Sequence, residues 1–382
     1  MEKTTGIDRA QFLAGTAAAG LAAALLPAGA ARAAEEWQAE QQGERPGLRH
    51  HGVVYTVGAG ETPGTAFSTT RMRRDIRVIR DELHADTVDV TGDGVERLTA
   101  TAAEAAERGL RVWLQPTVGD VPERDILEHL AETGRFAERL RRQGATVDLS
   151  VGCEFWLFVP GIVPGDTVLE RIRNLLDGKV DPVVMQRRLD RFTAKAAAVG
   201  RSVFRGRLSY AAAQDDRVDW RLFDVVGIDY YSYFADKAHY VGELKRYLRF
   251  GKPVAITEFG TCAYVGAPET GGMGWDVVDH DKHPEEIKGH LVRSERTQAA
   301  YLGQLLDVFD SLDLYAAMAF EFVTPDAPHR PDDPLHDLDM ASYSVTKTLK
   351  DRPDDPASGW HWEPKTAFHA LARRYATARA AR

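Results

Sequence analysis

Short apolar runs recur along the chain, and most of the segments between them carry apolar residues three or four positions apart. Several runs are apolar without interruption, as in Val225-Val226-Gly227-Ile228. A strand that lacks a polar face is typical of a parallel sheet covered on both sides. We therefore predict eight buried strands: His51–Val57, Thr87–Thr91, Arg111–Thr117, Thr146–Cys153, Arg207–Ala212, Asp224–Tyr230, Pro253–Glu258 and Tyr315–Phe322.

The segments between these runs predict helices. Ile76, Ile79 and Leu83 form one apolar face, and the stretch from Tyr301 to Phe309 forms another. Strands that alternate with helices indicate a parallel sheet, and right-handed crossovers close eight strands into a barrel. We predict the α/β class, with a single-domain (β/α)8 TIM barrel over residues 49–380. An open doubly wound sheet is the alternative, but no glycine-rich phosphate loop follows the first run.

Residues 1–33 have the pattern of an export signal. The apolar run from Phe12 to Leu26 follows Lys3 and Arg9 and is too short to span a bilayer comfortably. Ala31-Arg32-Ala33 then gives the small-x-small pattern of a cleavage site. We expect export by the Sec or twin-arginine route, a flexible leader at residues 34–48, and a secreted or extracytoplasmic protein with no membrane association after cleavage.

Composition narrows the range of partners. The 382 residues are 44% hydrophobic and 27% charged, which is ordinary for a globular protein. The formal net charge is -9, and removal of residues 1–33 takes away three positive and two negative charges, leaving about -10. Basic residues are not clustered enough to suggest nucleic-acid binding, so we expect no nucleic-acid partner. An acidic surface also repels polyanionic substrates.

Two glutamates, Glu154 and Glu258, each end an apolar run, 104 positions apart. They close the fourth and seventh predicted strands. In a parallel barrel the carboxyl ends of all strands meet at one face, and the long segments after the fourth, seventh and eighth strands would border that face. Two carboxyls over a shared cavity are what the cleavage of a glycosidic bond requires.

Three segments resemble the clan A glycoside hydrolases, which are retaining enzymes on a (β/α)8 barrel: Ile256–Gly260, Asp224–Tyr231 and Trp362–Phe368. The resemblance implies that Glu154 is the acid/base and that Glu258 is the nucleophile. It also implies that the Tyr231 hydroxyl hydrogen-bonds the nucleophile. The substrate would be a carbohydrate, and we expect no cofactor.

Three residues depart from the clan pattern. Cys153 stands where most members have an Asn that binds the sugar 2-hydroxyl, and a thiol is a poor hydrogen-bond partner. Asp229 stands where related strands often carry Asn or His, and Glu321 lies in a strand end where many members place a Trp. Either another side chain binds the 2-hydroxyl, or the substrate lacks a normal one, or the activity is weak or absent.

Aromatic and polar side chains gather near the predicted strand ends. Sugar faces stack on aromatic rings, although such rings also fill the core of a barrel. The residues that we predict to bind substrate are Tyr230, Tyr231, Asp229, Trp156, Trp275, Gln115, Glu321 and Cys153.

The adjacent His50 and His51 raise the alternative of a metal-dependent hydrolase barrel. Metal ligands on a strand must share a face, which requires a spacing of two, and histidines would have to recur on later strands. They do not, so we predict no metal site. Cys153 and Cys262 each lie close to one of the strand-end glutamates, and an exported protein permits a disulfide. We favour two buried free thiols.

The leading hypothesis is therefore an exported retaining glycosidase that acts on an oligo- or polysaccharide. The second is a barrel that binds carbohydrate, or serves in defence, without turnover, and Cys153 favours it. The third is another hydrolase barrel. The sequence does not identify the sugar, the linkage, endo or exo action, or the oligomeric state.

Overall fold

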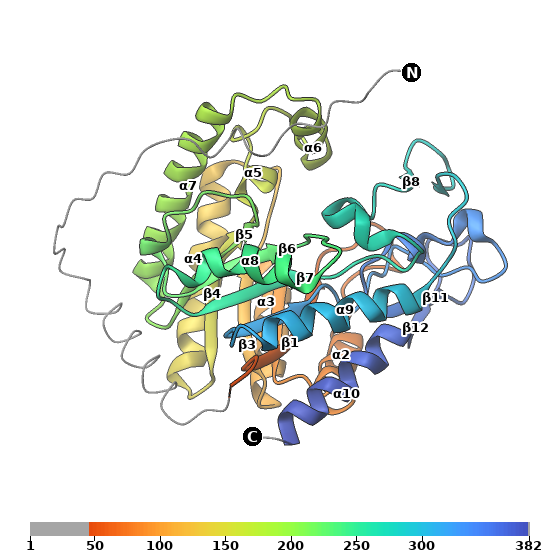
Figure 1. The fold of residues 1–382 in the computed structure, drawn as a ribbon, viewed down its shortest axis with the longest axis horizontal. Helices are drawn as coiled ribbons and strands as arrows, with labels where there is room; N and C mark the ends of the chain where they lie inside the picture. Colours follow the sequence, from red (N-terminus) through yellow and green to blue (C-terminus); the bar gives the residue numbers. More distant parts are fainter. Residues whose placement is uncertain (1–45, 381–382) are drawn as a thin grey trace.

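The computed structural model describes residues 46–380. The predicted export signal lies outside this range, as does all but the end of the predicted leader. Eight parallel strands close into a barrel in the order β1-β10-β7-β6-β5-β4-β3-β2 (Figure 1). The strands are β1 (His50–Val57), β2 (Thr87–Gly92), β3 (Arg111–Pro116), β4 (Val147–Cys153), β5 (Leu208–Ala213), β6 (Val226–Tyr230), β7 (Val254–Phe259) and β10 (Ala316–Ala319).

This architecture confirms the predicted (β/α)8 barrel. Each observed barrel strand overlaps a predicted one. The largest difference is at β10, which ends at Ala319 although the predicted strand continues to Phe322. The peptide bond between Phe320 and Glu321 is cis.

Amphipathic helices cover the outside of the barrel. They are α2 (Thr69–Asp81), α3 (Val95–Glu107), α4 (Glu123–Arg142), α7 (Pro182–Val203), α8 (Lys237–Leu248), α9 (Glu295–Asp310) and α10 (Thr366–Ala380). Several begin at a polar side chain that accepts a hydrogen bond from an otherwise unpaired backbone N–H, including Ser68 before α2 and Asp236 before α8. Only the short 3-10 helix η2 (Trp220–Leu222) separates β5 from β6, as the short gap between these strands predicts.

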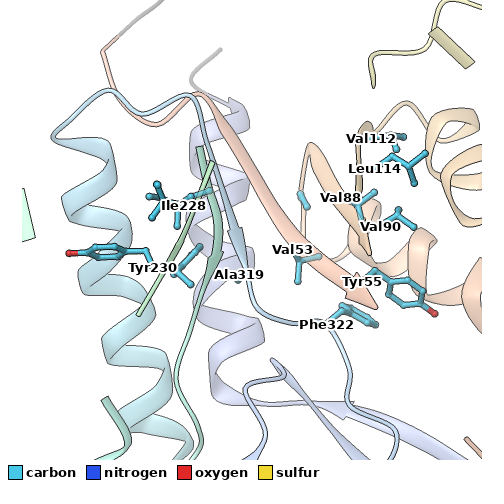
Figure 2. Packing of buried hydrophobic residues seen from close by; sticks show 14 of the residues in the cluster. Val53, Tyr55, Val88, Val90, Val112, Leu114, Ile228, Tyr230, Ala319 and Phe322 are labelled. Carbon is cyan, nitrogen blue, oxygen red and sulfur yellow. The ribbon is translucent and has the colours of Figure 1, made fainter. Parts of the chain in front are cut away.

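The core has two layers, because successive side chains on a strand point to opposite faces. The outer layer lies between strands and helices and includes Val53, Val88 and Ile228 (Figure 2). The inner layer fills the barrel with Val54, Trp113, Val225, Ala255, Tyr315, Ala316 and Met318. The barrel is therefore packed throughout its middle.

An ion network closes the barrel at the amino ends of its strands. The Asp148 carboxylate lies 3.0 Å from the guanidinium groups of both Arg111 and Arg207, and the Tyr315 hydroxyl donates to it at 3.1 Å. Burial opposes the ionisation of Asp148, but the two arginines outweigh it and hold its pKa below the ordinary value. A buried charge is tolerated here because it is paired on two sides.

Long segments follow β4, β7 and β10, as predicted. After β4 come α5 (Phe155–Phe158) and α6 (Val168–Leu176). After β7 come η3 (Ala267–Met273), β8 (Val278–Asp279) and β9 (Glu286–Ile287). After β10 come η4 (Pro334–His336), η5 (Leu338–Ala341) and the antiparallel pair β11 (Thr346–Lys350) and β12 (Trp360–Pro364). These segments border the mouth of the barrel, where the strands end.

Among residues 46–380, no helix has the length and apolar character needed to cross a membrane.

Candidate active site

Glu154 and Glu258 occupy the mouth of the barrel on strands that are three places apart in the barrel order. Glu154 directly follows β4 and caps α5, with φ 31° and ψ 60°. This left-handed conformation is unusual for a residue other than glycine, and such strain tends to occur at functional sites. Glu258 lies within β7, beside Asp229 of β6 in the strand register. Both glutamates are partly exposed.

Two side chains contact the Glu258 carboxyl, one at each oxygen. The Tyr231 hydroxyl donates a hydrogen bond of 2.8 Å to Oε2. The Cys153 sulfur lies 3.8 Å from Oε1. The first contact is the one that the clan resemblance implies for this tyrosine. The second brings the residue before Glu154 against the carboxyl of Glu258.

The two glutamates differ in how readily each keeps its proton. Burial, with the added charge of Glu258, raises the pKa of Glu154 to about 8. Burial also raises the pKa of Glu258, to about 7, but the Tyr231 hydrogen bond opposes that rise while the charge of Glu321 adds to it. Because the two groups interact, their protons leave in two steps that belong to the pair. The direction is clear: Glu258 ionises before Glu154.

Cys153 and Asp229 form a buried contact beneath this pair. The thiol donates to Oδ2 of Asp229 at 3.4 Å, and Oδ1 accepts a hydrogen bond of 2.7 Å from the Thr257 hydroxyl. Asp229 is only 1% exposed, and its pKa is raised by burial and by the charges of Glu258 and Glu154. Two of the three departures from the clan pattern therefore contact each other.

Both cysteines are buried and free, as predicted. The Cys262 thiol donates to the backbone oxygen of Ala341 at 3.0 Å, away from Cys153.

Glu321, the third departure, follows the end of β10. Its carboxyl accepts hydrogen bonds from the hydroxyls of Thr56 at 2.5 Å and Thr324 at 2.9 Å. Burial raises its pKa to about 7, although both hydroxyls favour the ionised form. The negative charge of Glu321 contributes to the raised pKa of Glu258.

Two groups of side chains could hold a metal ion by geometry. The donor atoms of Cys153, Asp229 and Glu258 lie within 4.8 Å of one another, as do those of His329, Asp337 and Asp339. An ion in the first group would occupy the carboxyl that would serve as nucleophile, so the two roles exclude each other. The second group already neutralises its charge with Arg293, whose nitrogens lie 3.2 Å and 2.8 Å from the two aspartates.

Tyr230 corrects one prediction. Its side chain points out of the barrel toward a helix, as Figure 2 shows, and is fully buried. Its hydroxyl donates to Glu243 of α8 at 2.8 Å, and its ring packs against Phe309 of α9. A residue on the outer face of β6 cannot contact a substrate at the mouth. The prediction that Tyr230 binds substrate is wrong.

The other predicted contact residues lie at different depths. Gln115 is fully buried inside the barrel and donates to Thr91 at 3.2 Å. Trp156 is half-buried and packs against the core between strands and helices. Trp275 packs in the cluster above β7 that also contains Tyr231. Their roles in substrate binding remain predictions.

Two further carboxyls near the pair, Asp89 and Asp216, are not among the residues predicted from the sequence. Asp89 of β2 is fully buried and neither of its oxygens has a hydrogen-bond partner among the described residues. Burial and the charge of Glu258 raise its pKa. Asp216 follows β5, accepts from the Tyr210 hydroxyl at 3.3 Å, and has its pKa raised to about 8 by burial and by Glu154. The alternation Val88-Asp89-Val90 could have placed Asp89 inside the barrel.

Comparison with known proteins places this site on a familiar scaffold. The sequence matches no protein-family model and no curated protein. A GH113 β-1,4-mannanase solved as a complex has a TM-score of 0.57 and 14% identity, over 86% of this chain and 99% of that one. The GH113 β-mannanase AaManA from Alicyclobacillus acidocaldarius, in complex with ManMIm, has a TM-score of 0.54 and 14% identity, over 88% and 99% of the two chains.

A calcium-binding mutant of β-glucuronidase 2 from Bacteroides uniformis has a TM-score of 0.55 and 12% identity. The match covers 86% of this chain but only 34% of that one. The structural neighbours are thus GH113 mannanases and other clan A glycoside hydrolases. At these identities the likeness shows the shared barrel fold.

Proposed function

We propose that the protein is an exported glycoside hydrolase that cleaves O-glycosidic bonds of an oligo- or polysaccharide with retention of configuration. The observation that carries the proposal is the arrangement around Glu258. This carboxyl accepts the Tyr231 hydrogen bond and interacts electrostatically with Glu154, which caps the helix after β4. The glycosidase names of the structural neighbours support the same reaction class.

The mechanism divides the work between the two carboxyls. Glu258, the first to ionise, attacks the anomeric carbon and forms a covalent glycosyl ester. Glu154, kept protonated by its raised pKa, gives its proton to the departing oxygen. Glu154 then takes a proton from water, the water oxygen attacks the same carbon, and Glu258 leaves as the carboxylate. Tyr231 orients the Glu258 carboxyl and stabilises its charge.

A carbohydrate-binding barrel without turnover is the second candidate. It is favoured by Cys153, which fills the position expected to bind the sugar 2-hydroxyl and instead donates to Asp229. Both candidates predict carbohydrate binding at the mouth, and they differ in whether a bond is cleaved.

The mature protein should be assayed against aryl glycosides and against mannan, glucan and other polysaccharides, with and without EDTA. We expect hydrolysis that is insensitive to EDTA and is abolished by Glu258→Ala. Glu128→Gln is a matched surface control, since the Glu128 side chain is 70% exposed. Activity that survives changes at both Glu154 and Glu258 would reject their assigned roles.

Azide separates the two carboxyl roles. We expect Glu154→Ala to regain activity on an activated aryl glycoside when azide is added, because azide needs no base to attack the glycosyl ester. The product should be a glycosyl azide with the configuration of the substrate. An inverted product would contradict the retaining mechanism. Export is tested separately, by sequencing the amino terminus of protein recovered outside the cytoplasm.

A further inference from the structure

A cavity of about 480 Å³ lies between the segment after β1 and the segment after β10. Its volume falls in the usual range of sites for small molecules. Glu321 forms part of its wall on the side of Glu258. Arg71 and Trp360 form another part, with the guanidinium 3.8 Å from the ring centroid.

The barrel order fixes which part of a substrate this cavity would meet. β4, which carries the proposed acid/base, lies across the barrel from β1 and β10. The leaving group must lie beside Glu154, so the sugar that becomes bonded to Glu258 extends in the other direction. The cavity therefore lies on the side of the retained sugar, the glycone.

The ionisable groups around the mouth are mostly carboxyls, so the mouth is acidic. Glu154, Asp229, Glu258 and Glu321 form no ion pair with any residue in the described part of the chain, and each has a raised pKa. The cavity wall also includes the carboxyls of Glu61 and Asp326, against the single guanidinium of Arg71. That guanidinium stacks on Trp360 rather than pairing with Glu321.

Glu321 is the buried carboxyl of this group that lines the cavity. It is 8% exposed, and its two hydrogen bonds come from the neutral hydroxyls of Thr56 and Thr324. Hydroxyls satisfy the oxygens of a carboxylate but do not neutralise its charge, and Lys365, a cation that lowers the pKa of Glu321, already pairs with Asp339 at 2.9 Å. A ligand ammonium group would supply the missing charge, whereas a ligand carboxylate would be repelled.

We propose that this cavity is a glycone-side subsite for a sugar with an unsubstituted amino group, and that Glu321 determines this specificity by pairing with the ammonium. The inference rests on the proposed function for its orientation, since the positions of Glu154 and Glu258 define the glycone side. It selects amino sugars over the uronic acids and neutral hexoses of related barrels.

Binding to a variant that cannot turn over separates specificity from catalysis. Glu154→Gln should be titrated calorimetrically with chitosan oligosaccharides, N-acetylated chito-oligosaccharides and manno-oligosaccharides of equal length. We expect the free-amine oligosaccharide to bind at least about tenfold more tightly than the other two, roughly one charge-assisted hydrogen bond in free energy. In the double variant Glu154→Gln/Glu321→Gln, in which residue 321 keeps its side-chain size, most of the preference for the free amine should be lost. Adding Glu128→Gln should leave it in place.

The outcomes also distinguish the subsite from the reaction. The subsite proposal is overturned if the three oligosaccharides bind with equal affinity, or if the preference for the free amine survives Glu321→Gln. Neither result bears on hydrolysis, which is tested by the assay described above. An amine preference that depends on Glu321, in a wild-type protein that hydrolyses nothing, supports the subsite and rejects the proposed reaction. Failure to bind any of the three overturns the subsite and leaves the proposed reaction to the hydrolysis assay.

Discussion

The Cys153 thiol donates a hydrogen bond of 3.4 Å to Oδ2 of Asp229, and the two residues stand at positions where related barrels favour amides or histidine. The contact joins the ends of β4 and β6 beneath the proposed nucleophile. A thiol thus stands where the clan pattern has an Asn that binds the sugar 2-hydroxyl, and a carboxyl stands where that pattern often has Asn or His. Because each residue satisfies the other, the two departures form one unit, and a change at either should affect the other.

The pH dependence of hydrolysis should be a narrow bell. Glu258 must be ionised, so activity rises as the pH passes its pKa of about 7. Glu154 must be protonated, so activity falls as the pH passes its pKa of about 8. Profiles of kcat/KM against pH test this directly. Glu154→Gln should lose the basic limb on an activated substrate and keep the acidic limb, and a basic limb that persists would assign it to another group.

Tyr231→Phe should move the acidic limb to higher pH. The Tyr231 hydrogen bond favours the ionised form of Glu258, so its loss raises the pKa of that carboxyl. A hydrogen bond to a charged group is worth about 1.5–3 kcal/mol, which corresponds to a shift of about one to two pH units. Tyr233→Phe is the matched control, because Tyr233 is 43% exposed. Equal profiles for the two variants would contradict this role.

The thiols of the folded protein should be unreactive. Cys153 is 6% exposed and its pKa is raised, first by burial and then by the charges of Asp229, Glu258 and Glu154. Cys262 is fully buried, and burial raises its pKa as well. A colorimetric thiol titration at pH 8 should detect neither cysteine in the native state and both in denaturant. Rapid native labelling, traced with single Cys→Ser variants, would show that one thiol is accessible.

Asp339→Asn should destabilise the segment after β10. Lys365 is fully buried, and its ammonium lies 2.9 Å from Oδ1 of Asp339. Removing the carboxylate leaves a buried cation without its partner, which typically costs about 3–5 kcal/mol. Urea unfolding at pH 7 measures the loss. The control is Asp354→Asn. The Asp354 side chain is 87% exposed and pairs with Arg330 at the surface, so its loss should cost at most about 1 kcal/mol. Equal stabilities of the two variants would refute the assignment.

Local pattern predicted the barrel well for a physical reason. Strands buried on both faces must be apolar throughout, and runs such as Val225–Ile228 meet that demand without help from distant residues. The end of β10 was less predictable, because Phe320 and Phe322 continue the apolar run after the chain has left the sheet. Glu154 and Glu258 were identifiable because each ends an apolar run with a charge.

Individual side chains near the mouth were harder to assign. Tyr230 and Tyr231 look alike in the sequence, but alternation along β6 sends Tyr230 outward and leaves the next residue free to turn toward Glu258. Asp216 follows β5 in a loop, and the effect of the Glu154 charge on its pKa comes from two segments far apart in the sequence, which no local spacing encodes. Buried carboxyls usually have a hydrogen-bond partner, but Asp89 has none within residues 46–380, so this rule did not help to place it.

The ion network around Asp148, with the packed side chains above it, has a kinetic consequence. It closes the far end of the barrel, so under the proposed function substrate binds and products leave at the mouth, where the strands end. A product that dissociates slowly from the mouth prevents the next substrate molecule from binding. The acidic lining would slow the release of cationic products most. Turnover on amino sugars should therefore slow as products accumulate, and added short products should inhibit competitively.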